Sequence, residues 1–130
     1  MQGEDRGIRL SLKKSDKLIY RSQFDQVRQE GKKTVGPGVV VAVAPCSEIG
    51  CGVICSKKFS LLSVERNRAR RLLWESFRML RPHLPACRLV LIPRQKLKKY
   101  KRQQATAEIA RLLAQQGIIP TEVAASFRES

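Results

Sequence analysis

The clearest alternation of apolar and polar positions runs from Val64 to Leu80 and predicts an amphipathic helix. This segment has no Gly or Pro and is rich in Arg, Leu and Ala, which favour helix. At about 100° per residue, one side collects Ala69, Leu72, Leu73, Ser76, Phe77 and Leu80. The other side collects Asn67, Arg68, Arg70, Arg71 and Trp74. The pattern therefore predicts a helix with one face for packing and one cationic face.

Shorter hydrophobic patterns surround this helix on both sides. They predict a helix at about Gln23–Glu30, strands at Val39–Ala44, Cys51–Lys57 and Arg88–Pro93, and a helix at Ala105–Gln116. Gly31 and Gly117 follow the two outer helices and would end them. Because a short connection joins the first two strands, we expect them to pair as an antiparallel hairpin.

The order helix, strand, strand, helix, strand, helix predicts an α+β fold. We expect a single-domain sandwich in which a sheet of about four strands is packed by three helices. The 130 residues suffice for one domain with one core. Residues 1–14 have mixed charge and little periodicity, and we expect a flexible arm there. Residues 118–130 lack clear partner elements, and we expect a loosely attached tail.

The charge balance changes this picture more than the size does. The chain has 26 Lys and Arg against 11 Asp and Glu, a formal net charge of +15. Such a charge attracts polyanions, and nucleic acid is the commonest one that a small basic protein meets. An acidic membrane surface is the alternative, but no apolar run approaches the roughly 18 residues of a membrane span. Nor does the N-terminus resemble a signal peptide, so we expect a cytoplasmic protein.

The cationic face of the predicted central helix is the candidate binding surface. It belongs to a cluster of four arginines within six residues: Arg66, Arg68, Arg70 and Arg71. Like charges spaced i,i+4 destabilise an isolated helix by about 0.2–0.5 kcal/mol, which an anionic partner would offset. Arginine also binds phosphate in a two-point geometry that lysine lacks. We therefore expect this face to bind phosphate groups, and the alternative is an ordinary solvated face.

Metal and catalytic sites receive little support from the sequence. The four cysteines, Cys46, Cys51, Cys55 and Cys87, lack the paired C-x-x-C spacing of zinc ribbons. We expect reduced, structural thiols, with zinc or a disulfide as the alternatives. The single histidine, His83, has no Ser or Cys positioned to complete a triad. A second basic run, 94–102, contains Arg94, Lys96, Lys98, Lys99, Lys101 and Arg102, with no acidic residue.

Three ordered motifs resemble the bacterial ribonuclease P protein subunit. The first is F-x-x-V-x-x-x-G, carried by Phe24, Val27 and Gly31. The second is G-V-x-x-S-K-K, carried by Gly52, Val53, Ser56, Lys57 and Lys58. The third is R-N-R-x-x-R-L-L, carried by Arg66, Asn67, Arg68, Arg71, Leu72 and Leu73 and followed by Phe77 and Arg78. The resemblance extends in order from about Leu12 to Leu113.

The resemblance implies a subunit of the ribonucleoprotein that removes the 5′ leader of precursor tRNA. Its partners would be the ribonuclease P RNA and precursor tRNA. The RNA carries the catalysis with Mg²⁺ ions. The resemblance implies no protein partner and no catalytic or metal-binding residue in the chain. The family fold also implies a left-handed β-α-β crossover around the arginine helix, where sequence patterning favours the right-handed form.

The resemblance also assigns roles to single residues. Those implied to bind the RNA subunit are Arg66, Asn67, Arg68, Arg70 and Arg71. Those implied to contact the precursor-tRNA leader are Phe24, Arg28, Lys57 and Lys58. An aromatic ring such as that of Phe24 can stack on an unpaired base, with core packing as the alternative.

Three positions depart from the family pattern. Arg28 and Ala42 stand where aromatic residues are frequent, so leader contacts here would depend more on charge. Trp74 stands where a basic residue is common, and it would either stack on an exposed RNA base or pack against the fold.

Two other functions remain as alternatives from the residues alone. A ribosomal or general RNA-binding protein would share the charge and the arginine helix. An autonomous metal-dependent nuclease would need several acidic side chains at one site, and the acids of this chain are scattered.

Overall fold

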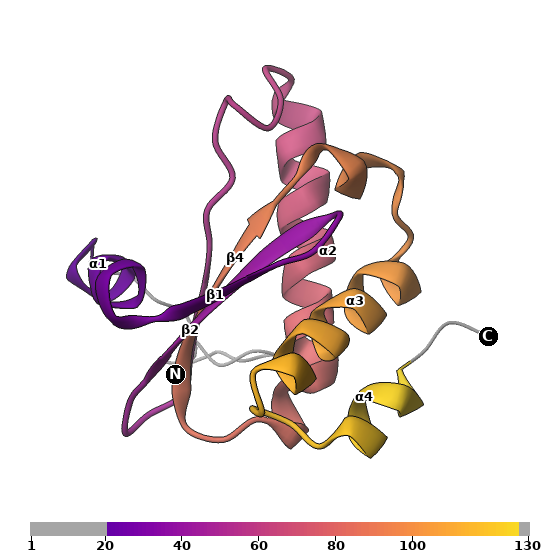
Figure 1. The fold of residues 1–130 in the computed structure, drawn as a ribbon. Coiled ribbons are helices and arrows are strands. Elements are labelled where there is room, and N and C mark those ends of the chain that lie inside the picture. Colours follow the sequence, from indigo (N-terminus) through magenta and orange to yellow (C-terminus); the bar gives the residue numbers. More distant parts are fainter. Residues whose placement is uncertain (1–20, 128–130) are drawn as a thin grey trace, which may run out of the picture.

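The structure is a computed structural model that describes residues 21–127. Its helices are α1 (Arg21–Glu30), α2 (Ser63–Leu80), α3 (Arg102–Gln115) and α4 (Thr121–Ser126). Its strands are β1 (Lys32–Val35), β2 (Val39–Pro45), β3 (Gly50–Val53) and β4 (Cys87–Pro93), with 3₁₀ turns at η3 (Arg81–His83) and η4 (Gln95–Lys99). Figure 1 shows α1 on one side of the sheet and α2 and α3 on the other. The expected arm, residues 1–14, lies outside the described residues.

The four strands form one mixed sheet in the order β1-β2-β4-β3. The expected hairpin between Val39–Ala44 and Cys51–Lys57 is wrong, because β4 lies between β2 and β3. β4 pairs antiparallel with β2 along seven residues and parallel with β3. It carries apolar side chains on both faces, which suits a central strand, whereas β3 (GCGV) has two glycines and ends at Val53. Long-range pairing therefore outweighs the short connection.

The sequence analysis missed β1, the edge strand. Its sequence, KKTV, is too polar to give a strand pattern. Lysines are common on edge strands because they discourage pairing with a second chain. The Gly36–Gly38 segment is consequently a turn within the sheet, closed by a hydrogen bond of 2.9 Å from the Gly36 amide to the Val39 carbonyl.

The parallel pairing of β3 with β4 makes β3-α2-β4 a crossover unit. This agrees with the crossover that the resemblance implied, while its left-handed sense stays a prediction. The apolar face of α2 is confirmed: Ala69, Leu73, Ser76, Phe77 and Leu80 are buried. The crossover therefore fixes the central helix against the sheet by that face.

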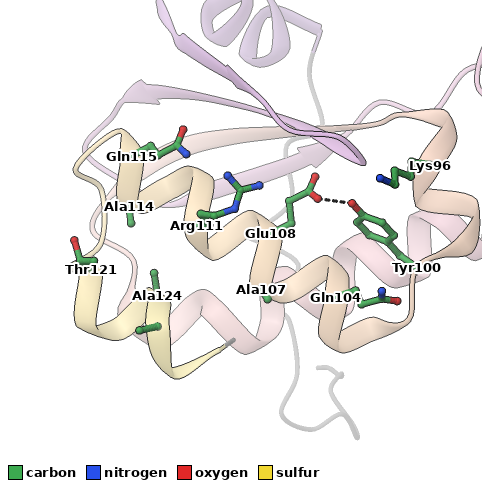
Figure 2. A pocket seen from close by; sticks show the side chains of 11 residues that line it. Lys96, Tyr100, Gln104, Ala107, Glu108, Arg111, Ala114, Gln115, Thr121 and Ala124 are labelled. Carbon is green, nitrogen blue, oxygen red and sulfur yellow. Dashed lines mark hydrogen bonds between the residues drawn. The ribbon is translucent and has the colours of Figure 1, made fainter. Parts of the chain in front are cut away.

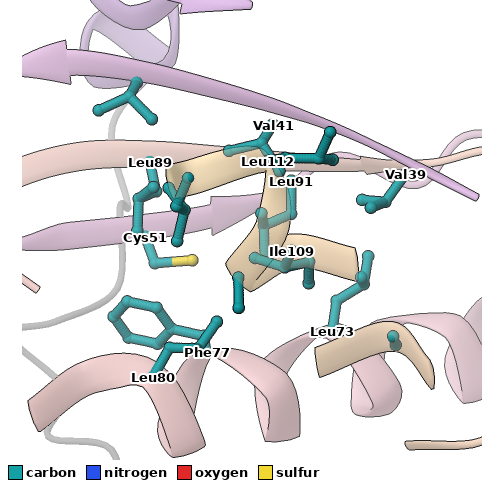
Figure 3. Packing of buried hydrophobic residues seen from close by; sticks show 14 of the residues in the cluster. Val39, Val41, Cys51, Leu73, Phe77, Leu80, Leu89, Leu91, Ile109 and Leu112 are labelled. Carbon is teal, nitrogen blue, oxygen red and sulfur yellow. The ribbon is translucent and has the colours of Figure 1, made fainter. Parts of the chain in front are cut away.

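The main core lies between the sheet and the two long helices α2 and α3. Figure 3 shows Leu73, Phe77 and Leu80 of α2 facing Cys51 and the alternating apolar side chains of β2 and β4. Cys51 is fully buried, as expected of a thiol that serves as a small hydrophobe, and all four cysteines are free thiols. The opposite face of the sheet carries a smaller cluster of Val27, Ala42, Ala44 and Val90 under α1.

The segment after α3 differs from the loose tail that we expected. Ile119 is only 3% exposed, and Val123 and Phe127 pack against the main core. The Phe127 ring lies edge-on to His83 with centroids 5.6 Å apart. The six residues of α4 are too few to show a helical period, but the neighbouring surface of α3 is enough to hold this short helix.

A buried carboxylate fastens α3 to the β1–β2 turn. Oε2 of Glu108 accepts hydrogen bonds from the amides of Gly38 and Val39, at 2.8 and 3.0 Å. Oε1 accepts a hydrogen bond from the Tyr100 hydroxyl, with 2.5 Å between the two oxygens. Figure 2 shows this bond. A Cβ on Gly38 would lie 2.5 Å from the Tyr100 ring, so this close approach requires glycine. Burial, followed by the hydrogen bond to Glu108 and its charge, raises the pKa of Tyr100 to about 12.

Truncation of the core face of α2 should destabilise the fold. We expect Leu73→Ala to lower the free energy of unfolding by about 2–5 kcal/mol, because the fully buried side chain leaves a cavity. Met79→Ala on the same helix is the matched control, since Met79 is 43% exposed and should change stability by no more than about 0.5 kcal/mol. Denaturant unfolding measures both, and equal losses would contradict the burial described for Leu73.

The Tyr100–Glu108 bond should make stability fall at high pH. An unfolded tyrosine has a pKa near 10, so the raised folded value gives stability that is complete below about pH 10 and lost as pH rises toward about 12. Tyr100→Phe should cost about 1.5–3 kcal/mol near neutral pH and progressively less across that window. Comparing denaturant unfolding of the two proteins cancels the titration of their shared lysines. A stability difference that stays constant with pH would contradict this role.

Candidate nucleic-acid interface

The polar side chains of α2 lie as the helical period predicted. Asn67, Arg68 and Arg71 are exposed, while Arg66 and Arg70 are half-buried. We call these five residues the arginine face. Asn67, Arg68 and Arg71 project away from the buried core face of α2, whereas the half-buried Arg66 and Arg70 lie closer to its edge.

The guanidinium groups of this face bond to neutral acceptors. Arg66 donates to the Ser60 carbonyl at 2.8 Å, and Arg68 to the Tyr100 carbonyl at 2.7 Å. Arg70 donates to the Cys55 carbonyl at 3.2 Å and to the side-chain oxygen of Asn67 at 3.0 Å. A carbonyl oxygen orients a guanidinium without neutralising its charge. These bonds therefore fix the arginines in place and leave the face fully cationic.

The nearest acid, Glu65, does not offset this charge. Its carboxylate accepts the Ser60 hydroxyl at 2.5 Å and lies 3.7 Å from the ammonium group of Lys98. Within residues 21–127 no ion pair joins a carboxylate to the arginine face. Arg71 is exposed and has no hydrogen-bond or ion-pair partner in this described part of the chain. The surface is thus ready to bind an external anion.

The two lysines expected beside this helix stand in the loop between β3 and α2. Because β3 ends at Val53, Lys57 and Lys58 lie in a turn beyond the strand rather than at its end. Both are exposed. Gln95 of η4 holds the turn by donating to the Lys58 and Phe59 carbonyls at 3.2 and 2.8 Å. The bonds from α2 to Cys55 and Ser60 hold its two flanks, so the lysines are carried next to the start of the helix (Figure 1).

The remaining two expected contact residues lie on α1, across the sheet. Phe24 is half-buried and packs on the cluster of Ala42, Ala44 and Val90. Arg28 is exposed and lies 3.7 Å from Asp25. Ile54, three residues before Lys57, packs on the same cluster. The structure therefore separates Phe24 and Arg28 from the arginine face, while the chain leads from their side of the sheet to the turn that carries Lys57 and Lys58.

Comparison with known proteins places the chain in a family. The family model described as Ribonuclease P matches residues 12–117. The chain belongs to the ribonuclease P protein family. The ribonuclease P protein component of Chlamydia trachomatis serovar L2 is 37% identical over 89 residues, 66% of this chain and 73% of that protein. The one from Chlamydia felis is 37% identical over 91 residues, 68% of this chain and 65% of that protein.

Solved structures show the same fold. The ribonuclease P protein of Staphylococcus aureus superposes with a TM-score of 0.72 at 21% identity, covering 82% of this chain and 99% of that one. The protein from Thermotoga maritima gives 0.66 at 24% identity, covering 76% of this chain and 96% of that one. The ribonuclease P protein acts with an RNA subunit in the 5′ processing of tRNA, and the RNA catalyses the cleavage.

Trp74 differs from its expected place on the open cationic side. It is half-buried, packs against the main core and meets the Phe77 ring edge-on with centroids 6.1 Å apart. A half-buried ring on α2 is compatible with both alternatives from the sequence, stacking on an RNA base and packing against the fold. This packing supports the second alternative for Trp74, namely that it packs against the fold.

Sequence reasoning missed the residues that support the arginine face from a distance. The carbonyls of Lys98 and Tyr100 lie about thirty residues after Arg68, and Gln95 lies 36 residues after Phe59. No local pattern links either pair of segments. The only signal was the basic run 94–102, which shows charge but not its neighbours. Among the described residues, no group of three or more His, Cys, Asp or Glu could hold a metal ion. No helix within 21–127 is long and apolar enough to cross a membrane.

Proposed function

We propose that the arginine face binds the RNA subunit of ribonuclease P. The observation that carries this proposal is the bonding of three guanidinium groups, those of Arg66, Arg68 and Arg70, to carbonyl and amide oxygens rather than to carboxylates. Such groups are oriented in advance, so binding phosphate costs little side-chain entropy. Arg66, Arg68, Arg70 and Arg71 supply charge-assisted bonds, and Asn67 keeps Arg70 in position.

We propose that the precursor-tRNA leader crosses the α1 side of the sheet toward Lys57 and Lys58. Phe24 offers part of its ring there. Among residues 21–127 the charge of Arg28 is held only by an exposed 3.7 Å pair with Asp25, which is worth at most about 1 kcal/mol. Ala42 is buried beneath α1 and presents no ring. Leader binding would accordingly rely on Arg28 and the two lysines more than on stacking.

Two further features of the proposal come from the family. The Mg²⁺ ions of the reaction are bound mainly by the RNA, and the protein assists their binding by screening phosphate repulsion around them. The complex works in the cytoplasm, the compartment that its precursor-tRNA substrate implies.

Reconstitution tests the proposed function. The purified full-length chain alone should not cleave precursor tRNA, but it should accelerate cleavage by the ribonuclease P RNA of the same genome at low Mg²⁺. The protein lowers phosphate repulsion that Mg²⁺ otherwise screens, so the stimulation should shrink as Mg²⁺ rises. Single-turnover cleavage of substrates with and without a 5′ leader measures it. No stimulation at any Mg²⁺ concentration would rule the function out.

Loss of one free arginine should reduce the number of phosphate contacts. We expect Arg71→Ala to weaken binding to the RNA subunit and to lower the slope of log K against log salt by roughly 0.7–0.9. Because Arg71 is exposed and makes no bond to residues 21–127, thermal unfolding should stay unchanged.

Arg28→Ala is the matched control for this measurement. It removes the same group from α1, so the salt slope for the RNA subunit alone should not change, while stimulation should fall only for substrates with a leader. Equal slope changes in both variants would mean that only net charge matters.

A further inference from the structure

The turn after β4 carries a second concentration of positive charge, which the proposed function does not use. Between Gln95 and Lys101 it presents four lysines: Lys96, Lys98, Lys99 and Lys101. We call this segment the lysine turn. Its apolar residues, Leu97 and Tyr100, are buried and anchor it. Its lysines therefore have to point outward or along the surface.

The lysine turn is joined directly to the arginine face. Arg68 of α2 donates to the carbonyls of Lys98 and Tyr100, at 3.4 and 2.7 Å, on both sides of Lys99. Gln95, at the start of the turn, holds the loop that carries Lys57 and Lys58. The lysine turn, α2 and that loop are thus connected by hydrogen bonds and form one continuous surface.

Most of the charge on the lysine turn is uncompensated. Lys98 is the exception, since its ammonium group lies 3.7 Å from Glu65 and 5.2 Å from the centroid of the Phe59 ring. Lys96, Lys99 and Lys101 are exposed, and their side chains form no ion pair with carboxylates of residues 21–127. Lys96 lies at the edge of the groove between α3 and α4 shown in Figure 2. Lys99 and Lys101 are the two that flank the residue bonded to Arg68.

We propose that the lysine turn is a second phosphate-contact surface for the RNA subunit, extending the arginine face along the same side of the sheet. This inference rests on the proposed function, and it selects the RNA subunit over the leader. α1, with Phe24 and Arg28, lies on the opposite side of the sheet (Figure 1). Lysine acts as a mobile point charge, so it suits backbone phosphates that need no fixed geometry.

The test compares two double variants that remove the same charge from different places. Lys99→Gln/Lys101→Gln removes two lysines of the turn. Lys32→Gln/Lys33→Gln removes two exposed lysines of β1. These lysines pair with Val43 and Ala42, toward the end of β2 that lies away from η4. Binding of each full-length protein to the ribonuclease P RNA is measured over a series of salt concentrations, without tRNA.

The proposal expects the first variant to weaken binding and to lower the salt slope by roughly 1.4–1.8, two contacts at about 0.7–0.9 each. The β1 variant should keep the wild-type slope. If Lys99→Gln/Lys101→Gln leaves the salt slope unchanged while Arg71→Ala still lowers it, the lysine turn does not contact the RNA. The proposed function would then still stand. Equal losses in both double variants would overturn the proposal for the lysine turn, as an effect of net charge. Wild-type protein that neither binds nor stimulates the RNA would overturn the proposed function itself.

Discussion

The packing of α2 across the sheet is the interaction on which the rest of the molecule depends. Leu73 and Phe77 are buried against both neighbouring strands and α3, which fixes the rotation of the helix about its own axis. The rotation in turn decides which residues face outward. With 3.6 residues per turn, a helix that buries Ala69, Leu73 and Phe77 has to expose Asn67, Arg68 and Arg71. The core thus aims the arginine face.

A fixed helix does not by itself leave its arginines free to bind an external anion, because carboxylates of the same chain can pair with them. Here the one acid in the first turn of α2, Glu65, is engaged by Ser60 and Lys98. The arginines take backbone carbonyls instead. Carbonyl acceptors belong to loops that the fold has already placed, at Cys55, Ser60 and Tyr100. The loops therefore set the geometry of these guanidinium groups, and their positive charge remains available to an external anion, here proposed to be the RNA subunit.

Local patterns predicted what depends on one segment, and they failed where distant segments meet. The two faces of α2 follow from its own period, and α1, α3 and β4 were placed within a few residues. The pairing of β2 with β4 joins residues more than forty positions apart, which no local pattern specifies. β1 was missed because an edge strand can be polar, and α4 because its stability comes from α3 rather than from its own sequence. The support of Arg68 by the lysine turn is a contact of the same long-range kind.

The sheet also separates the two RNA-contact surfaces proposed above. Within residues 21–127, one face of the sheet is covered by α2 and α3 and the other by α1. The positive charge on the first side lies on α2 and the lysine turn. Small residues on that second face, Ala42 and Ala44, let α1 pack closely but leave little aromatic surface for a base. A chain with less stacking area on its leader side has to obtain more of its affinity from charge. The loop with Lys57 and Lys58 meets this need, because it starts on the α1 side at Ile54 and ends at α2. In the proposed arrangement, the same loop would link the bound leader to the RNA that cleaves it.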